Sequence, residues 1–165
     1  MEPPVEPARA VLFDRDGTLV VDVPYNGDPG LVEVMPTVPE ALAMLRAAGL
    51  RLGVISNQSG IARGMIGVEQ VEAVNRRVDE LLGPFDVWLY CPHGPQDGCN
   101  CRKPLPKMVV DAARALEVEP SACVVVGDKE SDVQAALAAG ARALRFIPGS
   151  DMKKLLRSLI NLEPV

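Results

Sequence analysis

The chain has 165 residues, the usual size of one domain, and 48% of them are hydrophobic. Its net charge of −5 argues against a dedicated nucleic-acid binder or a protein of anionic membrane surfaces, because such proteins are basic. The single histidine excludes any centre that needs two. The N-terminus lacks the parts of a secretory signal, and no uncharged apolar run approaches the roughly 18 residues of a membrane span, so we expect a cytoplasmic protein without disulfides.

Short apolar runs alternate with amphipathic segments along the chain. Strands are predicted at 10–13, 50–55, 86–90, 123–126 and 141–146. Helices are predicted at 38–48 with Thr37 as N-cap, at 68–82, at 107–116, from a cap at Ser131 or Asp132 to 139, and at 151–161. This alternation predicts an α/β fold with a doubly wound parallel sheet flanked by helices, in one domain over residues 1–165 with an N-terminal tail at 1–8. Ligands of such sheets bind at the C-terminal ends of the strands.

Two carboxylates follow the first predicted strand, Asp14 and Asp16. Side chains two residues apart in an extended segment point the same way, and carboxylates so placed repel unless a cation or proton lies between them. The pair predicts a Mg²⁺ site, or a nucleophile with an acid/base partner, and the alternative is a solvated Asp-Gly turn. Asp128 would join the pair if the fourth strand lies beside the first. Asp132 is interpreted as a helix cap, and Lys129 either neutralises the carboxylates or is solvated.

Two other segments have the composition of a phosphate site. Residues 56–60 follow the second strand, where a serine hydroxyl and loop amides form a phosphate cradle or an ordinary polar turn. Arg102 and Lys103 precede the third helix, where paired cations clamp a phosphate or lie on the surface.

The loop at 91–103 contains the pattern Cys91-x-His93 and Cys99-x-Cys101. Three thiolates and one imidazole complete a tetrahedral zinc shell with no open position, so the pattern predicts a structural zinc site. The spacing is tighter than that of common zinc fingers. Burial as small hydrophobes is disfavoured because the loop has no apolar periodicity, whereas Cys123 lies in an apolar strand and is predicted to be a core residue.

Four segments together resemble the haloacid dehalogenase superfamily of phosphatases, and within it the group of heptose bisphosphate phosphatases and histidinol-phosphatases. They are 14–18 (Asp-Arg-Asp-Gly-Thr), 56–64 (Ser-Asn-Gln-Ser-Gly-Ile-Ala-Arg-Gly), 99–104 (Cys-Asn-Cys-Arg-Lys-Pro) and 127–132 (Gly-Asp-Lys-Glu-Ser-Asp). The resemblance implies a capless domain that removes a phosphate, the C7 phosphate in the heptose enzymes, from a small phosphorylated sugar through an aspartyl-phosphate. The zinc loop is shorter than expected for the heptose enzymes, which leaves the shape of the substrate wall open.

The resemblance also implies roles for individual residues. Asp14 would be the nucleophile and Asp16 the general acid/base, with Mg²⁺ held by Asp14, Asp128 and the carbonyl of Asp16. Ser56 and Lys103 would hold the transferring phosphoryl group. The remaining substrate residues would be Asn57, Gln58, Ser59, Arg102, Lys129 and, by location only, Asp22 and Tyr25. The expected molecule is a monomer with no nucleic-acid or membrane partner.

Three alternatives remain open at this point. Histidinol phosphate is a rival substrate for the same chemistry. A receiver-type phosphoacceptor domain shares the doubly wound sheet but stores phosphate instead of turning it over. A zinc-stabilised scaffold without activity is the third. The Asp14-x-Asp16 spacing, the cation pair and the zinc loop favour the phosphatase.

Overall fold

A computed structural model describes residues 6–160, and its centre is a parallel sheet of five strands in the order β3-β2-β1-β4-β5. β1 (Ala10–Phe13) lies in the middle, between β2 (Arg51–Asn57) and β4 (Cys123–Gly127). β3 (Val87–Cys91) and β5 (Arg142–Arg145) form the edges. The chain extends the sheet first to one side of β1 and then to the other, so the strand order reverses beside β1. This confirms the predicted doubly wound sheet.

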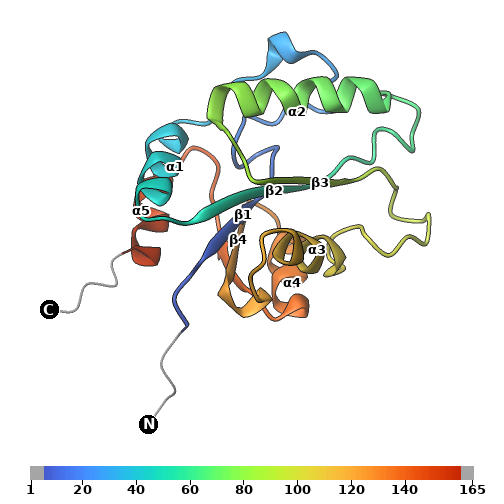
Figure 1. The fold of residues 1–165 in the computed structure, drawn as a ribbon. Helices are drawn as coiled ribbons and strands as arrows, with labels where there is room; N and C mark the ends of the chain where they lie inside the picture. The colour runs from blue at the N-terminus through green and yellow to red at the C-terminus, as the bar shows by residue number, and fades with distance from the viewer. Residues whose placement is uncertain (1–5, 161–165) are drawn as a thin grey trace, which may run out of the picture.

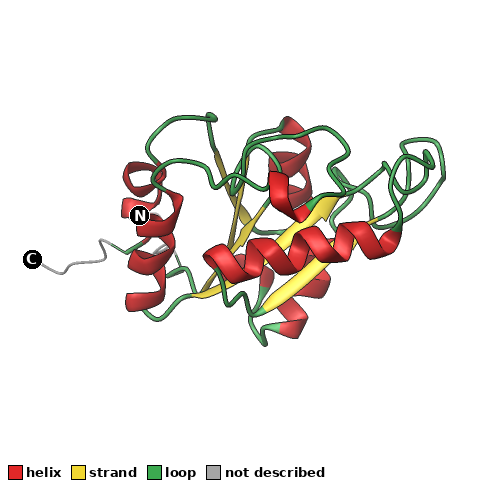
Figure 2. Ribbon diagram, turned by 90° about the horizontal axis from the view of Figure 1, so that it is seen from above, coloured by secondary structure: helices red, strands yellow, loops and turns green. Residues whose placement is uncertain are grey.

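Helices cover both faces of the sheet (Figure 1). α1 (Val38–Ala47), α2 (Val68–Leu82) and α5 (Met152–Leu156) lie on one face. α3 (Lys107–Ala115) and α4 (Glu130–Ala139) lie on the other. Seen from above, α2 runs across the strands on its side of the molecule (Figure 2). Short 3-10 turns occupy Pro29–Leu31, Pro120–Ala122 and Arg157–Leu159.

The core is divided by the sheet into two apolar clusters. Successive side chains of a strand point to opposite faces, so Val11 and Phe13 enter the cluster under α1 and α5, whereas Ala10 and Leu12 enter the cluster under α3 and α4. All four side chains are fully buried, as expected for a central strand of a parallel sheet. The rigid middle of the sheet therefore carries the residues that follow β1.

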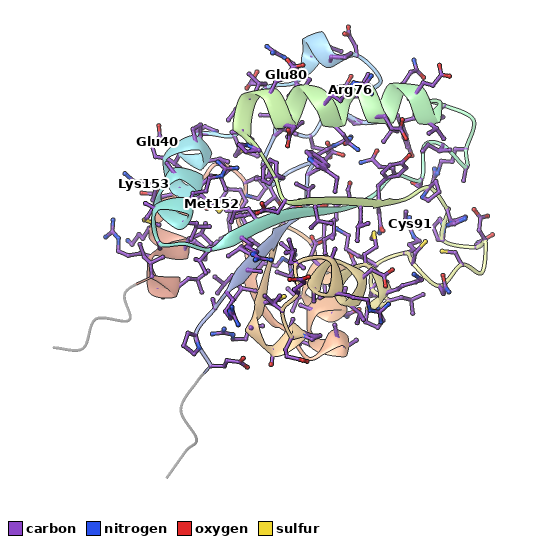
Figure 3. The ribbon with its side chains drawn as sticks, in the orientation of Figure 1. Glu40, Arg76, Glu80, Cys91, Met152 and Lys153 are labelled. Carbon is purple, nitrogen blue, oxygen red and sulfur yellow. The ribbon has the colours of Figure 1, made fainter. Side chains whose placement is uncertain are left out.

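Thr37 lies at the predicted N-cap position of α1, but its side chain does not cap the helix. Thr37 has φ 68° and makes no side-chain cap bond, because this left-handed backbone differs from the extended conformation of a capping residue. Its Oγ1 instead accepts a hydrogen bond from the backbone N–H of Met152 at 2.9 Å, which ties the start of α5 to α1. Met152 is itself buried beside α1 (Figure 3).

Two other predicted boundaries also differ. α4 begins at Glu130, ahead of the predicted caps, because the Asp132 carboxylate reaches back to the N–H of Lys129 at 3.1 Å. The last helix ends at Leu156 and continues only as a 3-10 turn to residue 159. The predicted end at residue 161 and residues 1–5 of the predicted tail lie outside the described residues.

No cap-sized insertion interrupts residues 6–160. The connection from β1 to α1 contains one 3-10 turn, and the connection from β3 to α3 is a loop. Within the same part of the chain, every helix is too short or too polar to cross a membrane.

Candidate active site

A cavity of about 260 Å³ opens at the carboxyl ends of β1, β2 and β4. Polar side chains from three strand ends and from the segment after β1 enclose it. The lining residues are Asp14, Asp16, Asp22, Pro24, Tyr25, Asn26, Asn57, Gln58, Ser59, Gly60, Lys103, Lys129, Ser131 and Asp132. The cavity thus lies beside the reversal of strand order, as the doubly wound topology predicts.

The base of this cavity is a buried ion triad. The Nζ of Lys103 lies 3.0 Å from Asp14 Oδ1 and 2.6 Å from Asp132 Oδ1, and it donates a third hydrogen bond to the carbonyl of Ile55 at 3.0 Å. Burial alone would lower the pKa of Lys103, but the two carboxylates raise it above its usual value. Lys103 is therefore a cation with all three N–H bonds directed by the protein.

The Asp14 carboxyl experiences the opposite balance. Burial raises its pKa, Lys103 lowers it, and the neighbouring carboxylates of Asp132 and Asp128 raise it again, so that it reaches about 7. A cation bound between Asp14 and these two carboxylates would reduce the repulsion among their negative charges.

Oxygen atoms of Asp14, Asp128 and Asp132 lie within 4.8 Å of one another. Hard carboxylate oxygens so grouped fit a divalent cation such as Mg²⁺. The turn after β1 passes so close to the Asp128 carboxylate that a Cβ on Gly17 would lie 2.5 Å from Asp128 Oδ2. Thr18 Oγ1 donates to Asp128 Oδ1 at 3.2 Å and thereby orients that carboxylate.

Asp132 is a site residue that the sequence analysis assigned only to helix capping. It does make the capping contact with Lys129, but its other oxygen holds Lys103, and the residue is 1% exposed. Its position four residues after Asp128, in the first turn of α4, is the signal that points it toward the same strand end.

The end of β2 contributes a chain of polar side chains. Gln58 Nε2 donates to Ser56 Oγ at 2.7 Å and to Asp16 Oδ2 at 3.1 Å. Asn57 accepts from the N–H of Lys103 at 3.0 Å and donates to its carbonyl at 3.2 Å. Asn57 thus holds the Lys103 backbone against β2. Ser56 is buried and reaches the cavity through Gln58, since it is not itself part of the cavity wall.

Asp16 has a partner that the sequence analysis missed. Arg15 is fully buried and donates two hydrogen bonds to the Asp16 carboxylate, Nε to Oδ1 and Nη2 to Oδ2, each at 3.1 Å. Its Nη1 donates to Asn75 Oδ1 on α2 at 2.7 Å. The sequence signal was an arginine between two aspartates directly after an apolar strand.

The predicted substrate residues divide into two groups. Those in the cavity wall are Asp22, Tyr25, Asn57, Gln58, Ser59, Lys103 and Lys129, and those outside it are Ser56 and Arg102. Arg102 lies outside because its Nη1 donates to the carbonyl of His93 at 3.2 Å and joins the cavity segment to the cysteine loop.

The cysteine loop brings together the side chains of Cys91, His93, Cys99 and Cys101, with ligand atoms within 4.8 Å of one another. Figure 3 shows Cys91 at the end of β3, with the other sulfur atoms of the loop beside it. Its Sγ lies 3.7 Å from that of Cys99 and 3.0 Å from that of Cys101. Thiolates on one tetrahedral zinc ion lie roughly 3.8 Å apart, which the Cys91–Cys99 separation matches, while the Cys91–Cys101 pair is closer. Three thiols and one imidazole are the donors of a structural zinc site, so the donor set fits zinc.

The thiols of this loop differ in acidity. Burial and hydrogen bonding with Cys101 raise the pKa of Cys91 to about 12. Desolvation would raise the pKa of Cys99 as well, but the backbone N–H groups of Arg102 and Cys101 lower it to about 7. The backbone therefore already favours a thiolate at one of the ligand positions.

A family model and individual relatives both match this chain, and both matches are to hydrolases. Residues 26–140 match the model of the haloacid dehalogenase-like hydrolases. The chain is 40% identical over 141 residues to a D-glycero-beta-D-manno-heptose-1,7-bisphosphate 7-phosphatase of Escherichia coli, covering 79% of this chain and 74% of the relative. It is 35% identical over 156 residues to the protein of that name from Pseudomonas putida, covering 89% and 87%.

A solved structure has the same architecture. The D,D-heptose 1,7-bisphosphate phosphatase of B. bronchiseptica, complexed with magnesium and phosphate, superposes with a TM-score of 0.78 at 34% identity. The match covers 91% of this chain and 86% of the other.

Proposed function

Because the chain belongs to the haloacid dehalogenase-like hydrolase family, we propose that it is a phosphatase that removes the C7 phosphate of D-glycero-D-manno-heptose 1,7-bisphosphate. The observation that carries this proposal is the buried triad in which Lys103 lies between Asp14 and Asp132 at the reversal of strand order. The relatives named for this reaction supply the substrate class.

Asp14 is the proposed nucleophile. One of its carboxylate oxygens attacks phosphorus in line with the bond to the sugar oxygen, and that P–O bond breaks as the aspartyl-phosphate forms. Lys103, with its charge fixed by two carboxylates and a carbonyl, neutralises charge on the phosphoryl oxygens. Ser56 supports the same site through Gln58.

Asp16 is the proposed general acid and base. It gives a proton to the leaving sugar oxygen and then takes a proton from the water that attacks the phosphorus of the aspartyl-phosphate. Inorganic phosphate leaves and Asp14 is regenerated. Asp16 suits this role because its side chain is 27% exposed and borders the cavity, while Asp14 is buried.

One metal ion is proposed for each donor set. Asp14, Asp128 and the carbonyl of Asp16 would hold Mg²⁺, which neutralises charge on the transferring phosphoryl group when bound. The four side chains of the cysteine loop would hold a structural zinc ion. Lys103 lies two residues after the ligand Cys101, so the zinc ion would also fix the cation that faces the phosphoryl group.

The mouth of the cavity suits a phosphorylated sugar. Asp22, Tyr25, Ser59 and Lys129 would contact the sugar and its second phosphate, and Arg102 would assist from the cysteine loop. We further propose that the chain acts as a single domain and a monomer.

Phosphate release tests the proposal directly. The α and β anomers of the heptose bisphosphate and histidinol phosphate are assayed with Mg²⁺, with Asp14→Asn as the inactive control. We expect many turnovers per enzyme and the highest kcat/KM for a heptose bisphosphate. A higher kcat/KM for histidinol phosphate would reassign the substrate, and a single stoichiometric phosphorylation would indicate a phosphoacceptor domain.

A further inference from the structure

Arg15 is a charged side chain in an unfavourable place, and nothing in the proposed reaction uses it. It is 1% exposed and is the largest of the fully buried side chains in the described part of the chain. Burying a guanidinium is unfavourable unless its N–H groups and its charge are matched. The positions of its partners therefore indicate what the group does.

Hydrogen bonds of Arg15 connect Asn75 on α2 to Asp16 at the cavity. Nε and Nη2 donate in parallel to the two oxygens of Asp16, both at 3.1 Å, and Nη1 donates to Asn75 Oδ1 at 2.7 Å. Two parallel bonds from a planar fork fix the plane of a carboxylate, which a point charge such as lysine does not. Asn75 lies in the middle of α2 and holds the remaining guanidinium nitrogen, Nη1.

Asp16 is held from a second direction as well. Gln58 Nε2 donates to Oδ2 at 3.1 Å, so three N–H groups set the orientation of this carboxylate. Asp16 borders the cavity, whereas Arg15 and Asn75 do not. Any effect of Arg15 on a bound substrate must therefore pass through Asp16.

We propose that Arg15 and Asn75 are positioning residues, which hold the Asp16 carboxylate in the orientation needed to protonate the leaving oxygen. This inference rests on the proposed function, because it assigns Asp16 the proton transfer. Proton transfer requires the two heavy atoms to approach within about 3 Å in good alignment. A carboxylate free to rotate would meet that condition for only a fraction of the time.

The test uses the leaving group of the substrate. A sugar or simple alkyl alkoxide is a poor leaving group and needs a proton as the P–O bond breaks, whereas p-nitrophenolate leaves without one. The ratio of kcat/KM for an alkyl phosphate to that for p-nitrophenyl phosphate thus measures proton donation. The parameter kcat/KM reports formation of the aspartyl-phosphate, so the later hydrolysis shared by both substrates does not mask the effect.

We expect Arg15→Met to lower kcat/KM for the alkyl phosphate by about 10- to 100-fold, which is part of the roughly 10²- to 10⁴-fold that general acid catalysis contributes. For p-nitrophenyl phosphate we expect kcat/KM to fall by less than about threefold, because its leaving group needs no proton. Arg15→Lys is expected to recover only a small part, because it restores the charge without the fork. Adding Arg15→Met to Asp16→Asn should cause little further loss, because both changes remove one function. Asn75→Ala should give the same selectivity with a smaller loss.

Val74→Ala is the matched control. Val74 is buried on the same helix, one residue before Asn75, so this variant lowers the melting temperature but leaves the side chains of Asn75, Arg15 and Asp16 in place. Its two kcat/KM values should change by the same factor. If Arg15→Met does not fold, Asn75→Ala decides the question, because it leaves Arg15 and Asp16 in place.

The outcomes are separable. Wild-type protein that releases phosphate from neither of these substrates nor from a heptose bisphosphate would refute the proposed function itself. Wild-type turnover combined with equal losses for both substrates in Arg15→Met and Asn75→Ala, or with fully additive losses in the double variant, would refute the positioning role. A loss confined to the alkyl phosphate supports it.

Discussion

Replacing Asp132 by asparagine tests whether the buried triad depends on this carboxylate. Asp132 is 1% exposed, and its Oδ1 lies 2.6 Å from Lys103 Nζ. Asparagine keeps the shape and an oxygen that can accept the Lys129 N–H. The substitution therefore removes one of the two charges that raise the pKa of Lys103, and it also removes the hydrogen bond between the two side chains, because an amide NH2 now faces Lys103 Nζ.

The expected loss of stability follows from the burial of the triad. Removing one partner of a buried ion pair costs about 3–5 kcal/mol, because the other charge is left unpaired in a low dielectric. Lys103 still contacts Asp14 at 3.0 Å, so we expect the lower limit, about 3 kcal/mol. In a domain of this size, that loss lowers the melting temperature by roughly 6–12 °C.

The same substitution should also impair turnover. Lys103 Nζ would no longer be drawn toward Asp132, and a misplacement of about 1 Å in a catalytic group can cost on the order of 100-fold in rate. We expect kcat to fall by about 10- to 100-fold in a phosphate-release assay, with the far-UV circular dichroism unchanged.

Asp111→Asn is the control, because it breaks a lysine–aspartate pair of the same chemistry on the surface. Lys107 and Asp111 lie one turn apart on α3 and are both partly exposed, so their pair contributes at most about 1 kcal/mol. Urea unfolding of both variants without added metal makes the comparison. A loss below about 1 kcal/mol for Asp132→Asn, equal to that of the control, would refute the reasoning.

Three further predictions concern the nucleophile and the two metal clusters. Asp14→Asn should abolish phosphate release, because an amide does not attack phosphorus, and near-normal rates would contradict the assignment. Gly17→Ala places a methyl group against Asp128, so calorimetry should show at least about tenfold weaker Mg²⁺ binding. Gly49→Ala is the control: Gly49 has a similar positive φ but open space around it, so this variant should bind Mg²⁺ normally. Purified protein should contain about one equivalent of zinc, and less than half would count against a tight site. Chelation should then make the loop thiols reactive toward Ellman's reagent, while Cys123, whose pKa is raised to about 11 by burial, should react only on unfolding.

The sheet was predictable because its signal is local. The run at 10–13 is apolar at every position, and the structure buries all four of its side chains at the centre of the sheet. The amphipathic helix at 68–82 was predicted to the residue, since its apolar positions repeat at helical spacing and Gly83 ends it. The joining of Asp128 to Asp14 was predicted only on the condition that the fourth strand lies beside the first, and the structure meets this condition by pairing β4 with β1.

The errors concern side chains with two possible partners. Thr37 precedes a helix and was expected to cap it, but its hydroxyl bonds to Met152, far away in the chain. Asp132 was expected only to cap α4, but one of its oxygens meets Lys103. A sequence shows that a residue can make a local contact. It does not show which distant group competes for the same oxygen.

Arg15 illustrates the same limit from the other direction. Between two aspartates, an arginine is easily interpreted as a neutralising or solvated charge, because its partner on α2 lies 60 positions away. Only the fold places Asn75 against the Nη1 of Arg15. Buried charges are thus the part of this site that sequence reasoning finds last, since their burial depends on helices that pack over them.

The balance of these buried charges gives the strongest physical reason for a metal ion in the proposed reaction. Asp14, Asp16, Asp128 and Asp132 carry four negative charges when all are ionised. Lys103, which contacts Asp14 and Asp132, and Arg15, which contacts Asp16, cancel two of these charges. Burial is the main cause of the raised pKa of Asp14, about 7, and the neighbouring carboxylates of Asp132 and Asp128 raise it further. A divalent cation would cancel the negative charge that remains and return Asp14 to the ionised form that a nucleophile requires. A phosphate ester then brings further negative charge, which Lys129 in the cavity wall is placed to meet. The same acidic cluster that would repel a phosphate on its own would therefore bind one once its cation is in place.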